Sequence, residues 1–220
     1  SEMGLNKKLL NKIKNNNLTV GIIGLGYVGL PLLIQFGSKK LKTIGFEVDP
    51  NKTKLINNGK SYIKHIKSEI ILELRNKNLV EATCDFSEIS KVDAIIICLP
   101  TPLTVNNDPD LSYIVNFLKL VKDDLRSGQI MSLESTTYPG TSDEIIKPFL
   151  NEKGFNVGKD FYLVYSPERE DPGNSDYCIK NIPKVLGGYS KECLEIGLSL
   201  YGKIVDKLIP VSNLKTAEMT

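Results

Sequence analysis

A short apolar run that leads into three spaced glycines is the feature that most constrains the fold of this chain. Residues 18–23 read as a buried strand, and Gly24, Gly26 and Gly29 follow with the spacing G-x-G-x-x-G before a helical pattern. In such a turn the first glycine permits the tight bend, the second lets the backbone approach a pyrophosphate, and the third lets the helix pack closely. The pattern predicts a dinucleotide site with the pyrophosphate at the positive helix N-terminus.

The residues that follow the glycines support this interpretation. A second β-rich run, 42–47, ends in Glu47, which lies 18 residues after Gly29. The dinucleotide fingerprint expects an acidic residue roughly 20 residues further on, where its carboxylate binds the ribose hydroxyls. Asp49 is a second candidate, but it precedes Pro50 and is expected to cap the next helix. A glycine-rich turn that only packs a helix on a sheet is the alternative, and the complete series of elements argues against it.

The composition is that of an ordinary water-soluble globular chain. Of its 220 residues, 41% are hydrophobic and 25% are charged, and the net charge is +2. This balance gives no reason to expect nucleic acid or a membrane surface as a partner. Residues 1–17 are polar and lack the apolar segment of a signal peptide, and no apolar run of about 18 residues occurs. We therefore expect a cytoplasmic protein.

The cysteines and the histidine indicate no metal site. Cys84, Cys98, Cys178 and Cys193 form no C-x-x-C pair, and His65 is the single histidine. We expect Cys98 to be a core thiol inside a buried strand, and Cys193 to be buried on an amphipathic helix. No local pattern marks any of the four as a nucleophile.

Strands and helices are expected to alternate along the chain. The expected strands are 18–23, 42–47, 79–83, 93–99, 129–133, 161–165, 184–187 and 203–209. The expected helices are 27–38, 50–58, 67–76, 111–125, 141–150 and 190–201. This alternation predicts an α/β fold of the Rossmann type, a doubly wound and mainly parallel sheet with helices on both faces. Ligands of such sheets bind at the carboxyl ends of the strands.

Three of the loops at that edge are rich in groups that can carry chemistry. They are 99–104, 134–141 and 165–174, in which prolines and glycines alternate with hydroxyls and carboxylates. A carboxylate such as Glu168, in a crowded cleft, can act as a general acid or base once its pKa is tuned. Taken alone, each loop could also be an ordinary turn with helix caps. Three of them on the edge that holds a cofactor favour catalysis.

The order of these motifs resembles the UDP-glucose/GDP-mannose dehydrogenase family of UDP-sugar 6-dehydrogenases. The motifs are 24–31 (GLGYVGLP), 99–102 (LPTP), 134–141 (ESTTYPGT) and 165–169 (YSPER), and the resemblance extends from residue 18 to the end. It implies oxidation of a sugar C6 alcohol to a carboxylate with reduction of two NAD. The aldehyde is held on a cysteine as a thiohemiacetal, oxidised to a thioester and hydrolysed.

The resemblance also implies roles for individual residues. Glu47 matches the ribose-binding acid, Thr136 the threonine that orders catalytic water, and Glu168 the acid or base that also faces the substrate. Arg169 is a candidate substrate contact. The remaining expected cofactor-lining residues, beside the three glycines, are Tyr27, Val28, Lys52, Leu99, Pro100, Thr101, Ser135 and Thr136.

One departure points to a branch of the family. UDP-glucose dehydrogenases usually carry a second glutamate four residues after the first, and Pro172 stands there in this chain. The loop resembles instead the branch that acts on UDP-N-acetylhexosamines, and the segment 59–66 (GKSYIKHI) supports that branch. His65 in this segment is either near the cleft or an ordinary loop histidine. The resemblance further implies bacterial or archaeal surface-polysaccharide synthesis and a full-length homodimer or higher oligomer.

The resemblance divides the chain into three parts. Residues 1–17 are a polar N-terminal extension, 18–212 the NAD-binding domain, and 213–220 resemble the start of the family's central helix. The catalytic lysine, asparagine and cysteine of the family would then follow Thr220, so we expect this chain by itself to be inactive.

Three alternatives remain. The chain could belong to a UDP-glucose or GDP-mannose dehydrogenase, or it could be an NAD-binding module without catalysis. A 3-hydroxyacid dehydrogenase would share the first motif but not the loop 165–169.

Overall fold

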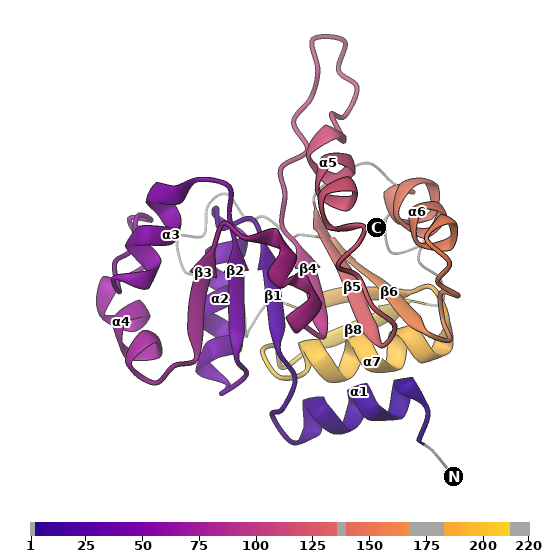
Figure 1. Cartoon of the computed structure of the whole chain (residues 1–220), viewed down its shortest axis with the longest axis horizontal. Helices are drawn as coiled ribbons and strands as arrows, with labels where there is room; N and C mark the ends of the chain where they lie inside the picture. Colours follow the sequence, from indigo (N-terminus) through magenta and orange to yellow (C-terminus); the bar gives the residue numbers. More distant parts are fainter. Residues whose placement is uncertain (1–2, 136–139, 168–182, 212–220) are drawn as a thin grey trace.

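The computed structural model describes residues 3–135, 140–167 and 183–211, and it contains one eight-stranded sheet (Figure 1). The strand order is β3-β2-β1-β4-β5-β6-β7-β8. All neighbouring strands run parallel except β6 and β7, which are antiparallel. The strands are β1 (Val20–Ile23), β2 (Thr43–Phe46), β3 (Val80–Thr83), β4 (Ala94–Ile97), β5 (Gln129–Ser135), β6 (Phe161–Pro167), β7 (Lys184–Gly188) and β8 (Leu208–Val211). The mainly parallel, doubly wound sheet expected from the sequence is confirmed.

The central strands are apolar throughout because both of their faces are covered. In β4, Ala94 and Ile96 pack into one core cluster, while Ile95 and Ile97 pack into the other. All four side chains are fully buried. Since successive side chains of a strand point to opposite faces, a central strand must be hydrophobic at every position.

Helices cover the two faces. Residues of α1, α2, α4 and α7 belong to one core cluster, and residues of η1, α5, η2 and α6 belong to the other. These elements are α1 (Leu5–Lys14), α2 (Gly29–Ser38), α4 (Ser68–Asn76), α7 (Lys191–Tyr201), the 3-10 helix η1 (Phe86–Lys91), α5 (Ser112–Val121), the π-helical turn η2 (Ser142–Ile146) and α6 (Lys147–Glu152). The helix α3 (Pro50–Asn57) lies beside β3 at one end of the sheet (Figure 1).

One helix was not expected from the sequence. Residues 5–14, within the polar segment that precedes the first strand, form α1, which packs against α7. Leu9 and Ile13 lie one turn apart and are buried, whereas the lysines around them face solvent. Two apolar residues four apart are enough to define a buried stripe on a short helix, and the polar composition of the segment concealed them.

Other boundaries differ from expectation at the ends of strands. Strand β4 ends at Ile97, so the expectation that Cys98 lies inside a strand as a core thiol is wrong, and Cys98 is half-buried. The last strand begins at Leu208, although Ile204 and Val205 were expected to belong to it. Both are buried in the turn after α7, which explains why an apolar run resembled a strand there. Cys193 is buried on α7, as expected.

The topology fixes the place of a ligand site. Strand β1 lies between β2 and β4, and the chain leaves β1 and β4 toward opposite sides of the sheet. The loops after these two strands therefore diverge and leave a crevice at their carboxyl ends, where ligands of doubly wound sheets bind.

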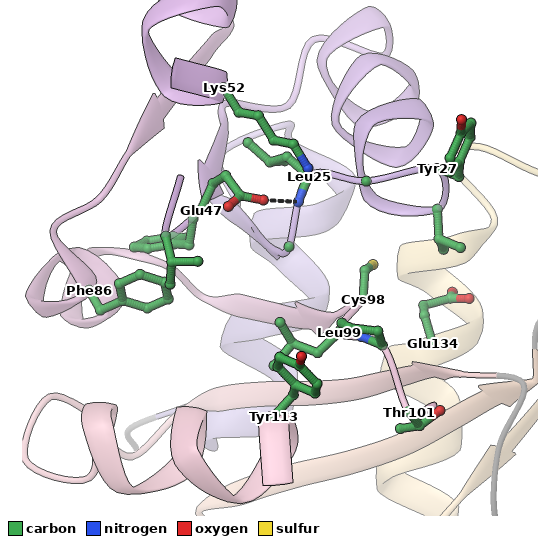
Figure 2. A pocket seen from close by; sticks show the side chains of 16 residues that line it. Leu25, Tyr27, Glu47, Lys52, Phe86, Cys98, Leu99, Thr101, Tyr113 and Glu134 are labelled. Atoms are coloured by element: carbon green, nitrogen blue, oxygen red, sulfur yellow. Dashed lines mark hydrogen bonds between the residues drawn. The ribbon is translucent and has the colours of Figure 1, made fainter. Parts of the chain in front are cut away.

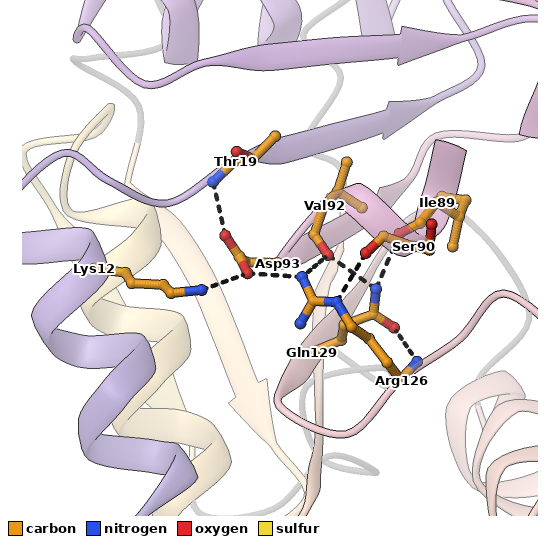
Figure 3. Close-up of polar contacts among 8 residues, drawn as sticks. All are labelled: Lys12, Thr19, Ile89, Ser90, Val92, Asp93, Arg126 and Gln129. Atoms are coloured by element: carbon orange, nitrogen blue, oxygen red, sulfur yellow. Dashed lines mark hydrogen bonds and ion pairs between the residues drawn. The ribbon is translucent and has the colours of Figure 1, made fainter. Parts of the chain in front are cut away.

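The opposite, amino edge of the sheet is held by a buried carboxylate, that of Asp93 (Figure 3). Asp93 accepts hydrogen bonds from Lys12 of α1 at 3.0 Å, from Arg126 at 2.9 Å and from the backbone N–H of Thr19 at 3.0 Å. Burial raises the pKa of Asp93, but these hydrogen bonds and charges outweigh it and hold the pKa below its ordinary value. One carboxylate thus joins α1, the start of β1 and the segment before β5.

We expect Asp93→Asn to lower the free energy of unfolding by about 1–3 kcal/mol at neutral pH, because two cations lose their buried partner. A carboxyl whose folded pKa is lowered stabilises the fold above its ordinary pKa of about 3.9, and the contribution is lost as the pH falls through the folded pKa. In urea titrations, the difference in the free energy of unfolding between the variant and the parent chain should therefore shrink below about pH 4. Glu73→Gln, at the exposed pair with Lys77, is the control and should change little. A pH-independent difference would contradict the role of the charge.

Candidate cofactor site

A cavity of about 430 Å³ opens at the carboxyl ends of β1, β2 and β4 (Figure 2). Its lining comes from the turn after β1, the end of β2, the loop after β4, the end of β5 and two elements from elsewhere in the chain. The lining residues are Gly24, Leu25, Gly26, Tyr27, Val28, Phe46, Glu47, Val48, Lys52, Phe86, Cys98, Leu99, Pro100, Thr101, Tyr113 and Glu134.

The three glycines of the turn meet different surroundings. Gly24 has φ +91°, and a Cβ there would lie 2.9 Å from the carbonyl oxygen of Cys98. A Cβ on Gly29 would lie 1.7 Å from the carbonyl oxygen of Gly24, so only glycine lets α2 approach the strand. A Cβ on Gly26 would meet nothing within 4 Å, because this position faces the open cavity. The backbone there is accessible to a phosphate group, which helix N-termini bind through N–H groups.

Glu47 lies one residue beyond β2, at the wall of the cavity beside the glycine turn (Figure 2). Glu47 is 8% exposed, and its carboxylate accepts hydrogen bonds from the backbone N–H of Leu25 at 3.2 Å and of Asp49 at 2.7 Å. Asp49 in turn caps α3 by accepting from the N–H of Asn51 at 2.9 Å. The structure thus separates the two acidic candidates: Glu47 faces the cavity and Asp49 is a helix cap.

Apolar surfaces flank Glu47. Phe46 and Phe86 are in ring contact, with centroids 5.7 Å apart, and Val48, Leu99 and Tyr113 extend this wall. Val48 and Tyr113 are respectively 77% and 49% exposed, so this wall offers apolar surface to a ligand. A flat heterocycle would bury this surface while its ribose reaches the Glu47 carboxylate.

The opposite end of the cavity contains Cys98, Thr101 and Glu134 (Figure 2). Glu134 lies on β5 and is buried, and its carboxylate pairs with the ammonium of Lys184 of β7 at 2.9 Å. The same ammonium lies 5.0 Å from the ring centre of Tyr201. Burial raises the pKa of the Tyr201 hydroxyl, and the charge of Glu134 raises it further. The cavity therefore ends at a paired carboxylate, and a neutral tyrosine lies next to that ion pair.

Most of the residues expected at a cofactor site meet at this cavity. Tyr27, Val28, Glu47, Lys52, Leu99, Pro100 and Thr101 line it together with Gly24 and Gly26, while Gly29 packs behind the turn. Ser135 ends β5, and its side chain lies outside the described residues. Thr136, Glu168 and Arg169, with their expected catalytic and substrate roles, also lie outside them. His65 is exposed and is not among the lining residues.

Sequence reasoning missed several lining residues. Phe86 and Tyr113 belong to η1 and α5, far along the chain from the glycine turn, and no motif marks them. Cys98 and Glu134 follow buried strand residues, and their position at the strand ends was the available signal. In the described part of the chain, no group of three or more His, Cys, Asp or Glu side chains is placed to hold a metal ion, and no helix is long and apolar enough to cross a membrane.

Residues 18–205 match the NAD-binding domain of the UDP-glucose/GDP-mannose dehydrogenase family. The chain belongs to this family, and the match spans all the residues that line the cavity. The resemblance inferred from the motifs is confirmed, and so is NAD as the cofactor.

Individual relatives agree with this assignment. The chain is 35% identical over 204 residues to protein CapL of Staphylococcus aureus, and 32% identical over 204 residues to UDP-N-acetyl-D-glucosamine 6-dehydrogenase of Pseudomonas aeruginosa. Each match covers 92% of this chain and 47% of the relative. The crystal structure of NDP-N-acetyl-D-galactosaminuronic acid dehydrogenase from Methanosarcina mazei Go1 superimposes with a TM-score of 0.86 at 29% identity, covering 99% of this chain and 48% of that one. The chain therefore spans about half the length of these relatives.

We expect Gly26→Val to abolish NAD binding without unfolding the domain. The added side chain would occupy the open space through which a pyrophosphate approaches the backbone, and its Cβ would meet no protein atom within 4 Å. Calorimetry should detect no NAD binding, while the melting temperature stays near that of the parent chain. Gly29→Val is the matched control and should destabilise the fold, because its Cβ would collide with the Gly24 carbonyl. Unchanged NAD affinity of Gly26→Val would place the pyrophosphate elsewhere.

We expect the chain to prefer NAD to NADP, because the Glu47 carboxylate repels a 2′-phosphate. Glu47→Ala should weaken NAD about tenfold or more, since hydrogen bonds to charged groups contribute about 1.5–3 kcal/mol. Titration calorimetry with both cofactors measures this. Asp49→Ala, which removes the neighbouring helix cap, should lower stability and leave cofactor preference intact. Equal affinity of the parent chain for the two cofactors would contradict the assignment of Glu47.

Proposed function

We propose that this chain is the NAD-binding half of a UDP-N-acetylhexosamine 6-dehydrogenase, which oxidises the sugar C6 alcohol to a carboxylate. The observation that carries the proposal is the cavity at the glycine turn, in a family domain whose YSPER motif (165–169) begins at the end of β6. The loop has Pro172 where UDP-glucose dehydrogenases usually have a second glutamate. The names of two relatives, which refer to N-acetylated sugars, support the same branch.

The register of the sheet supports a common site for the two proposed catalytic residues. Strands β5 and β6 pair in parallel, with Ser135 opposite Pro167. Thr136 and Glu168 are the next residues of the chain after these partners. We propose that Thr136 orders water and that Glu168 moves the proton of the sugar hydroxyl and later activates water for thioester hydrolysis.

The described residues would hold NAD in the cavity for this reaction. NAD, when bound, accepts the hydride from the sugar carbon. Glu47 and the apolar wall around Phe86 would hold its adenosine end, and the turn amides its pyrophosphate. The nicotinamide end of NAD would then lie near Thr101 and Glu134, next to the ends of β5 and β6. The cysteine nucleophile of the covalent step, and the lysine and asparagine that stabilise the oxyanion, are proposed to come from outside this chain.

The wider setting is part of the same proposal. The enzyme would act in the cytoplasm in surface-polysaccharide synthesis, and the full-length protein would be a homodimer or a higher oligomer. These points rest on the resemblance of the motifs to the family.

We expect the 220-residue chain to bind NAD and to oxidise no sugar nucleotide, whereas the product of the whole gene oxidises a UDP-N-acetylhexosamine. The test measures NADH formation by its near-ultraviolet absorbance with UDP-N-acetylglucosamine, UDP-N-acetylmannosamine, UDP-glucose and GDP-mannose. Preference of the whole product for UDP-glucose or GDP-mannose would overturn the proposed branch. Turnover by the 220-residue chain would place the nucleophile among its own cysteines. NAD binding without turnover by the whole product would indicate a non-catalytic module.

A further inference from the structure

A tyrosine outside the glycine turn contacts the backbone of that turn directly. The hydroxyl of Tyr62 donates a hydrogen bond to the carbonyl oxygen of Leu25, which lies between Gly24 and Gly26. Tyr62 belongs to the segment 59–66, between α3 and α4, and does not line the NAD cavity. The similarity of this segment to one branch of the family does not account for Tyr62.

The segment around Tyr62 is held firmly. Ile63 and Ile66, which both follow Tyr62 in the chain, are buried in the core cluster that also contains Leu25. The hydroxyl of Ser61 bridges the backbone, donating to the carbonyl of Ile63 at 3.0 Å and accepting from its N–H at 3.1 Å. The N–H of Ser61 donates to the hydroxyl of Ser68 at 3.0 Å. Tyr62 is therefore a fixed donor rather than a mobile surface side chain.

Leu25 is fixed from the other side as well. Its N–H donates to the Glu47 carboxylate at 3.2 Å, and its side chain is fully buried against Gly45, where a Cβ would lie 2.6 Å from a Leu25 methyl group. The carbonyl of Leu25 is the remaining polar group of this residue, and Tyr62 holds it. The Tyr62 hydroxyl stays protonated as a donor, because burial and the nearby charges of Glu47 and Asp49 raise its pKa.

The carbonyl of Leu25 and the N–H of Gly26 belong to one peptide unit. The described chain contains no cis peptide bond, and in a planar trans peptide the C=O and N–H bonds point in opposite directions. When Tyr62 holds the carbonyl on its own side, the Gly26 N–H must point away from Tyr62. Gly26 faces open space within the cavity, and its N–H donates to no acceptor among the described residues.

We propose that Tyr62 is a positioning residue for NAD, which fixes the Leu25–Gly26 peptide plane so that the Gly26 N–H points at the pyrophosphate. Without this hydrogen bond the peptide can rotate, and the amide must be ordered again when the phosphate binds. The inference rests on NAD binding by the family domain and not on the identity of the sugar.

The Tyr62 ring also contacts a second group of the cavity. The ammonium of Lys52, which lines the cavity, lies 5.5 Å from the ring centre. A substitution that removes the ring would therefore change two features at once. Tyr62→Phe keeps the ring beneath Lys52 and removes only the hydroxyl, so it isolates the hydrogen bond to Leu25.

The experiment compares Tyr62→Phe with Tyr162→Phe by titration calorimetry with NAD. Tyr162 is a matched control, because its hydroxyl also donates to a backbone carbonyl, that of Lys159 at 2.9 Å, but lies on β6 away from the cavity. Tyr62→Phe should weaken NAD about three- to tenfold, the range of a neutral hydrogen bond. Tyr162→Phe should leave NAD affinity within about twofold. NMR titration with adenosine, which lacks the pyrophosphate, should give equal affinities for the parent chain and Tyr62→Phe.

Weaker NAD binding by Tyr62→Phe, with unchanged adenosine binding and a melting temperature close to that of Tyr162→Phe, supports the proposal. Unchanged NAD affinity overturns it. An equal loss of NAD and adenosine binding also overturns it, because the hydroxyl would then support the fold in general and not the phosphate-binding amide. A failure of the sugar-nucleotide assay leaves each of these outcomes readable, since none of them involves a sugar.

Discussion

The close approach of α2 to the end of β1 is the constraint on which the rest of the structure depends. A Cβ at Gly29 would lie 1.7 Å from the carbonyl oxygen of Gly24, so the helix can begin at this point only on a glycine. The contact places the positive end of α2 beside the crevice formed by the diverging loops after β1 and β4. The same turn leaves Gly26 open toward the cavity. Packing and phosphate binding are therefore two results of one backbone geometry.

The amino and carboxyl ends of the central strands have different roles because these strands are parallel. All their amino ends meet at one edge, where Asp93 joins α1, β1 and the segment before β5 through charged hydrogen bonds. All their carboxyl ends meet at the other edge, where the loops form the cavity. The buried pair of Glu134 and Lys184 lies at this second edge and ties β5 to β7. A buried ion pair is costly to desolvate, and because Glu134 lines the cavity, its partner Lys184 offsets the negative charge of that wall.

Much of the candidate site could be predicted from sequence because its core is a local motif. The glycine spacing and the acidic residue at the end of the next strand are separated by one helix, and both lie at the cavity. Asp49 before Pro50 was expected to be a helix cap and is one. Phe86, Tyr113 and Tyr62 could not be assigned in this way. Each reaches the cavity or its turn from an element that becomes a neighbour only when the sheet and its helices assemble.

The sequence by itself determined the α/β class, the mainly parallel sheet and the glycine turn before α2, because these follow from periodicity, glycine spacing and helix caps within short stretches of chain. Only the tertiary structure decided the order of the strands, the antiparallel pairing of β6 with β7 and the docking of α1 on α7. It also decided that Cys98 leaves the strand to line the cavity, and that Tyr62 holds the Leu25 carbonyl. Such contacts join residues far apart in the chain, and their free energy depends on geometry that forms only when the whole core packs.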